Sequence, residues 1–139
     1  CPPPDHLTAI PVRSGAYPPH VDRTRELALV AVGGAVGTLV RYALDDWVGA
    51  VQDLPLSTLL VNLLGSLALG VLVGAGVPER LRLLLGTGLL GGFTTYSAFA
   101  VQVQDLGSRG DLLLGAGYAL VTVAGGFALA VVGLRWGRR

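Results

Sequence analysis

Residues 91–99 read Gly-Gly-Phe-Thr-Thr-Tyr-Ser-Ala-Phe, and they interrupt Leu83–Val103, a stretch of 21 residues without a charged side chain. A helix of roughly 20 apolar residues crosses a ~30 Å hydrocarbon core. No water is available there for a loose backbone, so irregular structure is tolerated only where it is buried in protein or lines a polar cavity. Adjacent glycines followed by Thr-Thr-Tyr-Ser favour a break in such a helix. The motif therefore predicts an ion or substrate site at the break.

Three further apolar stretches accompany this one, and they are Leu27–Leu44, Leu56–Val77 and Leu112–Leu134. Only 14% of the residues are charged, well below the ~25% of soluble domains. We therefore predict an all-α membrane protein with four transmembrane helices, the third broken near its middle. The transmembrane domain is expected to span residues 25–139. Residues 1–24 contain six prolines and are predicted to form a disordered tail.

The arginines are distributed unevenly between the two predicted sides. With four crossings, the N-terminus, residues 78–82 and the C-terminus share one side, which carries eight arginines: Arg13, Arg23, Arg25, Arg80, Arg82, Arg135, Arg138 and Arg139. The other side carries Arg109, joined by Arg41 if that side chain extends outward, beside five aspartates. Basic residues in short loops stay on the cytoplasmic side. The bias predicts a multi-pass protein of the cell membrane with both termini in the cytoplasm.

The predicted membrane helices offer little for catalysis. No Asp, Glu, His or Lys lies in the last three apolar stretches, and His6 and His20 both lie in the N-terminal tail. Proton-coupled transport needs a titratable group inside the membrane, and catalysis needs a nucleophile with a base or a metal. These absences argue against an enzyme and against proton coupling. The net charge of +1 argues against a nucleic-acid partner.

Asn62 is the most notable of the neutral polar residues in the predicted membrane helices. Placing its amide in mid-bilayer costs free energy unless the amide is hydrogen-bonded. Thr58 lies four residues earlier, on the same face of a helix. The pair fits either hydrogen bonding between helices or the lining of a pore, and the sequence leaves both open. Tyr118 and Thr122 repeat the four-residue spacing, which packing also explains.

Small residues recur at four-residue spacing, as in Gly33 with Gly37, Gly70 with Gly74, and Gly126 with Ala130. Such spacing lets two helix backbones approach closely. The pattern fits packing within one subunit as well as a contact between subunits. Near the break, Tyr96 and Phe99 share a face if the helix resumes after Thr95.

These motifs together resemble the Fluc (CrcB-type) fluoride channels. Residues 91–99 resemble that family's third-helix signature, Gly-Gly-x-Thr-Thr-Phe-Ser-Thr-Phe. Residues 33–42, with two glycines, Gly37 and then Arg41-Tyr42, resemble its first helix. Residues 58–65, Thr-Leu-Leu-Val-Asn-Leu-Leu-Gly, resemble its second, and Tyr118 with Thr122 resembles its fourth more weakly. The resemblance covers residues 27–135, in the family's order.

The resemblance implies antiparallel dimers of four-helix subunits, with two fluoride pores along the dimer interface. Carried over to this sequence, the pore residues are Asn62, Tyr96, Phe99, Thr58, Ser97 and Thr122. It also implies a structural Na⁺ at the dimer interface, held by the backbone carbonyls of Gly91 and Thr94, with no catalytic residue. Arg41 is assigned a structural role. The expected function is a fluoride-selective channel subunit that exports cytoplasmic fluoride and so reduces its toxicity.

Three positions depart from the family pattern. Tyr96 stands where the first phenylalanine is usual and adds a hydroxyl and bulk, Ala98 replaces a threonine, and Gln102 stands where a glutamate often follows. The strong arginine bias favours one half of an obligate heterodimer over a homodimer, which must insert both ways. Tyr96 is compatible with a heterodimer in which one pore is degraded. A small multidrug-type transporter would need a membrane-embedded glutamate in its first span, and Leu27–Leu44 has none. A purely structural membrane protein would not need the break.

Overall fold

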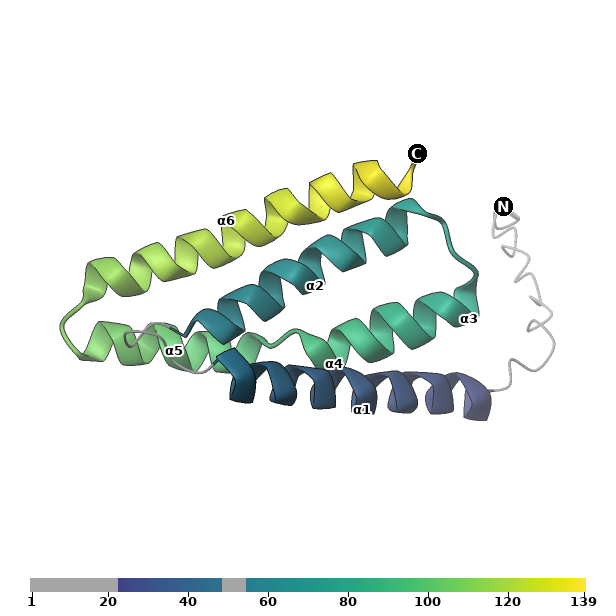
Figure 1. Ribbon diagram of the computed structural model, residues 1–139, viewed down its shortest axis with the longest axis horizontal. Helices are drawn as coiled ribbons and strands as arrows, with labels where there is room; N and C mark the ends of the chain where they lie inside the picture. The colour runs from purple at the N-terminus through teal and green to yellow at the C-terminus, as the bar shows by residue number, and fades with distance from the viewer. Residues whose placement is uncertain (1–22, 49–54) are drawn as a thin grey trace, which may run out of the picture.

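The computed structural model describes residues 23–48 and 55–139. The chain folds into four long helical segments that lie side by side (Figure 1). Their elements are α1 (Arg23–Val48), α2 (Leu56–Gly74), α3 (Glu79–Leu81), η1 (Arg82–Leu90), α4 (Gly91–Phe93), α5 (Tyr96–Ser108) and α6 (Leu112–Gly137). The third segment joins α3, η1, α4 and α5 over Glu79–Ser108. Arg23 and Thr24, which the sequence places at the end of the predicted tail, belong to α1; the rest of the predicted tail lies outside the described residues.

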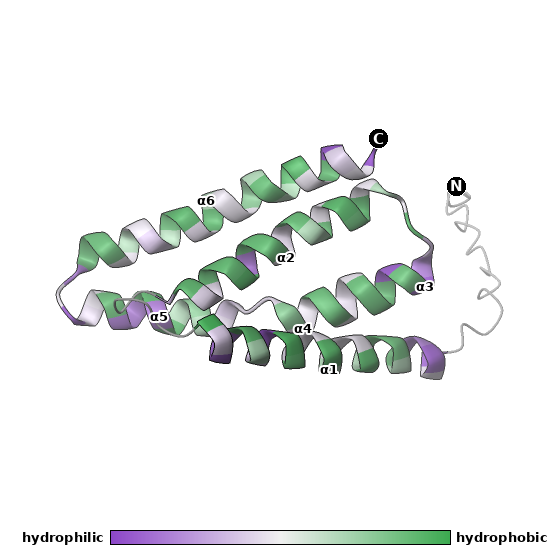
Figure 2. Ribbon diagram, viewed as in Figure 1, coloured by the Kyte–Doolittle hydropathy of each residue, from purple (hydrophilic) through white to green (hydrophobic). Residues whose placement is uncertain are grey.

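All four segments are long and apolar enough to cross a membrane, which confirms the predicted spans. Figure 2 shows apolar residues along their whole length and polar ones concentrated at their ends. The two tryptophans are exposed at opposite ends of the molecule, Trp47 near the end of α1 and Trp136 near the end of α6. Tryptophan is enriched at both membrane–water interfaces, so these positions fit the two edges of a bilayer.

The glycine stripes pack helices together within one chain. A methyl group added at Gly33 or Gly37 would overlap the backbone of η1, and one added at Gly70 or Gly74 would overlap the backbone of α6. In each pair of helices, the later glycine contacts residues later in the partner helix. Therefore α1 runs parallel to η1, and α2 runs parallel to α6. Sequence could not separate this arrangement from a contact between subunits. The structure assigns these stripes to packing inside the subunit.

The third segment has two irregular features. Residues Arg82–Leu90 form a π-helix, a rare form that is frequently found at functional sites. The helix then breaks at Thr94 and Thr95, whose backbones are extended, with ψ values of 153° and 120°. The glycine pair, expected to be part of the break, is instead helical. Gly92 lies against the backbone of Gly34 on α1, where no side chain would fit.

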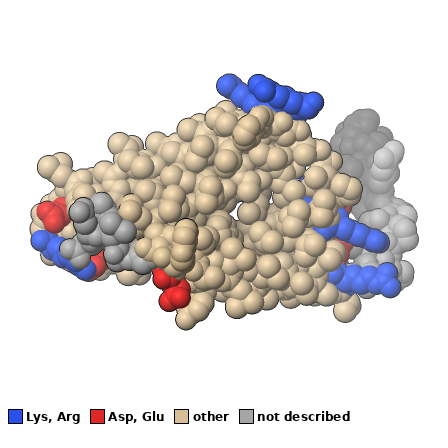
Figure 3. All heavy atoms as spheres, in the orientation of Figure 1, with Lys and Arg blue, Asp and Glu red and all other residues tan. Residues whose placement is uncertain are grey.

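Charge separates the two ends of the molecule. Figure 3 shows arginine atoms at the end where α1 and α3 begin and α6 ends. The aspartates of the described residues lie toward the other end, where Arg109 pairs with Asp105 at 2.6 Å. The arrangement in space agrees with the sides predicted from the sequence.

Candidate functional site

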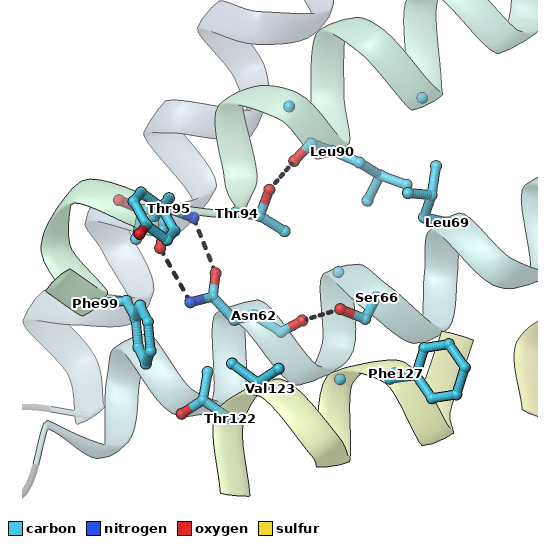
Figure 4. Close-up of a pocket in the computed structure, with 15 residues that line it drawn as sticks. Asn62, Ser66, Leu69, Leu90, Thr94, Thr95, Phe99, Thr122, Val123 and Phe127 are labelled. Atoms are coloured by element: carbon cyan, nitrogen blue, oxygen red, sulfur yellow. Dashed lines mark hydrogen bonds between the residues drawn. The ribbon is translucent and has the colours of Figure 1, made fainter. Parts of the chain in front are cut away.

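The break in the third segment is held by a side chain from α2. Asn62 Nδ2 donates to the Thr95 carbonyl at 3.0 Å, and Thr95 N–H donates to Asn62 Oδ1 at 2.9 Å (Figure 4). The side-chain amide thus pairs with the backbone of one residue as a neighbouring strand would. Thr95 is buried, and unpaired backbone groups there would each cost about 1–3 kcal/mol. Asn62 therefore acts as the interhelical hydrogen-bonding residue that the sequence allowed.

Threonine hydroxyls bond to further backbone groups on both sides of the break. Thr95 caps α5 by accepting a hydrogen bond from Ala98 N–H at 3.2 Å, an interaction typically worth about 1 kcal/mol. Its hydroxyl also lies 3.3 Å from the Ser97 hydroxyl, and either can be the donor. On the other side, the Thr94 hydroxyl donates to the Leu90 carbonyl at 2.9 Å. The Thr-Thr pair explains how the helix can open here without leaving these amides unpaired.

This pairing leaves two carbonyl groups without their usual helical donors. In an α-helix, the Thr95 amide would bond to the Gly91 carbonyl and the Ala98 amide to the Thr94 carbonyl. Both amides are engaged elsewhere, by Asn62 and by the Thr95 hydroxyl. Oxygen ligands of this kind suit a hard cation. Within the described part of the chain, no group of three or more His, Cys, Asp or Glu residues could hold a metal ion.

A hollow of about 410 Å³ lies beside the break, between α2, the third segment and α6. Figure 4 shows its lining converging from these elements. The residues that line it are Asn62, Gly65, Ser66, Leu69, Gly86, Leu90, Gly91, Thr94, Thr95, Tyr96, Phe99, Thr122, Val123, Gly126 and Phe127. Asn62 and the threonines are polar, and the rest of the wall is mainly apolar. The hollow thus combines a few hydrogen-bonding groups with an apolar wall, as ligand sites commonly do.

Three aromatic rings form a row next to the hollow. The ring centres of Tyr96 and Phe99 are 6.0 Å apart, and those of Phe99 and Tyr118 are 5.9 Å apart. Tyr96 and Phe99 share a face because the helix resumes at Tyr96, as predicted. Aromatic rings carry a positive edge, so the row can present positive ring edges to an anion.

A second polar contact ties the helices together farther along α5. Gln102 Nε2 donates to Thr58 Oγ1 at 2.9 Å, and the Tyr118 hydroxyl donates to Gln102 Oε1 at 2.9 Å. This network joins α2, α5 and α6. In the sequence alone, Gln102 stands out only as a departure from the family pattern. Its position three residues after Phe99, on the same helix face, was the signal that placed it beside the aromatic row.

The structure gathers most of the predicted site residues. Asn62, Tyr96, Phe99, Thr122, Gly91 and Thr94 all line the hollow. Thr58 and Ser97 do not line the hollow itself. Thr58 is buried and accepts a hydrogen bond from Gln102, and the Ser97 hydroxyl lies beside the Thr95 hydroxyl. Arg41 is half-buried on α1, and its Nε atom is buried with no hydrogen-bond partner among the described residues.

Comparison with known proteins identifies the family. The family described as "CrcB-like protein, Camphor Resistance (CrcB)" matches residues 28–134. A "Fluoride-specific ion channel FluC" from Erythrobacter litoralis is 41% identical over 117 residues, which cover 76% of this chain and 86% of that protein. "Fluoride-specific ion channel FluC 2" from Rhodococcus jostii is 44% identical over 107 residues, covering 77% and 94%. A "Fluoride-specific ion channel FluC" from Gloeobacter violaceus is 44% identical over 117 residues, which cover 78% of this chain and 93% of that protein. The chain therefore belongs to the CrcB-like family.

Proposed function

We propose that this chain is a subunit of a fluoride-selective ion channel in the cell membrane, where it lets cytoplasmic fluoride leave and so reduces fluoride toxicity. The observation that carries the proposal is the hollow at the break, which brings hydrogen-bond donors and aromatic rings together without an acidic side chain. Relatives with at least 41% identity are named as fluoride-specific channels. The comparisons thus favour a channel over an enzyme or a small multidrug-type transporter.

Fluoride is small and strongly hydrated, so a pore must replace its water with donors. Asn62 uses one Nδ2 hydrogen for Thr95, and the amide has a second hydrogen left to donate. Thr58 accepts from Gln102, so its own hydroxyl hydrogen remains to be donated. Thr122, in contrast, already donates to the Tyr118 carbonyl at 2.8 Å, so it must rotate before it can donate to an ion. Neutral donors of this kind can bind an anion and still release it, as conduction requires.

The hollow favours an assembly in which a second subunit completes the pore. Its rim includes apolar side chains that are largely exposed, with Tyr96 81%, Phe127 73% and Val123 63% exposed. The family resemblance supplies the form of the assembly, an antiparallel dimer with its pores along the interface. A second copy, or a homologous partner, would cover this face.

The sodium ion belongs to the same proposal. The diverted helical bonds leave the Gly91 and Thr94 carbonyls suited to a cation, and two subunits would supply four such oxygens. The ion would lock the two breaks together at the dimer interface rather than take part in conduction. Replacing Na⁺ with a bulky organic cation should lower the thermal stability of the dimer, and equal stability in both would count against the site.

The arginine bias favours a heterodimer with an oppositely oriented homologue over a homodimer. A chain that inserts in one orientation, with both termini in the cytoplasm, cannot form an antiparallel pair with itself. With Cys1 replaced by serine, cysteines introduced at Asp53 and at the exposed Arg139 should then each react with an impermeant label from one side only. Comparable labelling of both sites from both sides would establish dual insertion and the homodimer instead.

The function itself is tested by ion efflux from liposomes that contain the purified protein, together with its partner if one is required. Fluoride efflux should be fast, should follow the membrane potential and should not depend on a proton gradient. Chloride should be retained under the same conditions. Equal efflux of the two anions would contradict the proposal.

A further inference from the structure

The hollow at the break extends past Asn62 and Thr122, on the side away from the aromatic row. Figure 4 shows Ser66 on this side, farther along α2 than Asn62 and toward Phe127. Here α2 and α6 line the hollow with Gly65, Ser66, Leu69, Val123, Gly126 and Phe127, and Ser66 carries the one hydroxyl group among them. Ser66 follows Asn62 by four residues, or about 6 Å along the helix axis. The hollow therefore has a further hydrogen-bonding side chain about one turn beyond the amide of Asn62.

Gly126 on α6 leaves space beside the Ser66 hydroxyl. It takes the next position in the four-residue spacing of Tyr118 and Thr122, so the hydroxyl-bearing positions of this helix face end at Thr122. A Cβ atom added at Gly126 would lie 3.2 Å from Ser66 Oγ, closer than ordinary van der Waals contact, and 3.9 Å from Ser66 Cβ. The absence of a side chain at Gly126 therefore gives the hydroxyl group of Ser66 room to turn.

The Ser66 hydroxyl can turn without leaving a carbonyl group unpaired. It donates to the Asn62 carbonyl at 2.7 Å, a bond that serine can make to the preceding turn of its own helix. In an α-helix the same carbonyl also accepts the Ser66 amide hydrogen. The carbonyl therefore keeps a partner when the hydroxyl rotates to another staggered position. The hydroxyl can thus exchange this carbonyl for an ion in the hollow.

We propose that Ser66 is a further fluoride-binding residue, to which the ion passes from Asn62. The inference rests on the proposed channel function. The Ser66 hydroxyl turns away from the Asn62 carbonyl, through the space beside Gly126, and donates to the ion. Conduction requires sites that bind an ion and release it again, often several in a row. Ser66 supplies such a site among the apolar side chains of Leu69 and Phe127.

Fluoride efflux from liposomes that contain the assembled protein tests the inference. Ser66→Ala should lower the efflux rate about fivefold, the change that corresponds to one neutral hydrogen bond. Ser108→Ala is the matched control, because the Ser108 hydroxyl also donates to a carbonyl of its own helix, at 2.9 Å, but is exposed and lies outside the hollow. Its efflux rate should equal that of the unmodified chain.

Gly126→Ala tests the space beside the hydroxyl. Its methyl group should slow efflux when Ser66 is present, because it crowds Ser66 Oγ. In the Ser66→Ala background the nearest atom is the side-chain carbon at 3.9 Å, so the same change should cause no further loss. A further loss there would assign the effect to a blocked path and would count against the inference. Gly117→Ala, with no contact within 4 Å among the described residues, is the control and should conduct normally.

Slower efflux in Ser66→Ala, with a normal rate in Ser108→Ala, supports the inference, and an equal loss in both would overturn it. Equal efflux from Ser66→Ala and the unmodified protein would overturn the role of Ser66 and leave the proposed function standing. No fluoride efflux from the unmodified protein would contradict both. Size-exclusion chromatography shows which variants assemble. If Ser66→Ala does not, Gly126→Ala should still conduct more slowly than Gly117→Ala, and equal rates in those two would contradict the inference.

Discussion

At the scale of single residues, the side chains of Asn62 and Gln102 hold the site together by bonding to residues far away in the sequence. Asn62 and Thr95 are 33 residues apart and exchange two hydrogen bonds, and Gln102 reaches Thr58 across 44 residues. Sequence identified Asn62, Tyr96 and Phe99 as site residues. It could not show which backbone group pairs with Asn62, because such a pair depends on the arrangement of the helices and not on local spacing.

Tyr96 offers the sharpest prediction at this scale. Its ring packs against Phe99 and its side chain is mostly exposed at the rim of the hollow. Tyr96→Phe keeps the ring and its positive edge but removes a donor and bulk from the path of the ion. We expect the fluoride efflux rate to increase severalfold in the assembled protein.

The matched control is Tyr42→Phe, which removes an exposed hydroxyl from α1, outside the hollow. Its efflux rate should equal that of the unmodified chain. Loss of efflux in Tyr96→Phe would show that the Tyr96 hydroxyl is itself an essential ligand for the ion.

At the scale of elements, the four spans and the broken third helix follow from sequence, but the position of the break does not. The expected break included the glycine pair, whereas the chain stays helical to Phe93 and opens at Thr94 and Thr95. Gly92 serves close packing against α1 instead. A glycine favours both a break and a close approach, and only the neighbouring helix decides between them.

Close packing of α1 against η1 can be tested with two adjacent glycines. A methyl group at Gly33 would overlap η1 backbone atoms, while one at Gly34 would have only an ordinary contact of 3.8 Å with the Gly88 carbonyl. Gly33→Ala should therefore lower the free energy of unfolding by about 1–3 kcal/mol. Gly34→Ala should be neutral or stabilising by up to about 1 kcal/mol, since alanine favours helix.

Thermal or denaturant unfolding in detergent, followed by circular dichroism, measures both variants. A similar loss of stability in Gly33→Ala and Gly34→Ala would mean that the two helices do not approach as described. If neither variant lost stability, that result would also mean that α1 and η1 do not approach each other as described.

At the scale of the whole molecule, the hollow at the break has a largely exposed rim, which fits the proposal that one subunit presents half of a pore. The apolar stretches predict four candidate spans, and the structure has four helical segments of suitable length and hydropathy. The arginine distribution predicts that one end of the bundle is richer in arginine, and Figure 3 shows this. The partner that would cover the hollow comes from the family resemblance and from the exposed rim. Its identity depends on a second chain, so the sequence of this one can only favour a heterodimer through its charge bias.

We propose that fluoride passes beside the break that Asn62 holds. The most direct test is fluoride efflux from liposomes that contain the assembled Asn62→Asp variant. Its carboxylate still accepts from the Thr95 amide but removes the amide donors and repels an anion. Gln104→Glu, the same change at an exposed position of α5 outside the hollow, is the control. Liposomes with assembled Asn62→Asp should retain fluoride, while those with Gln104→Glu should release it as the unmodified chain does. Normal efflux through an assembled Asn62→Asp protein would contradict this proposal.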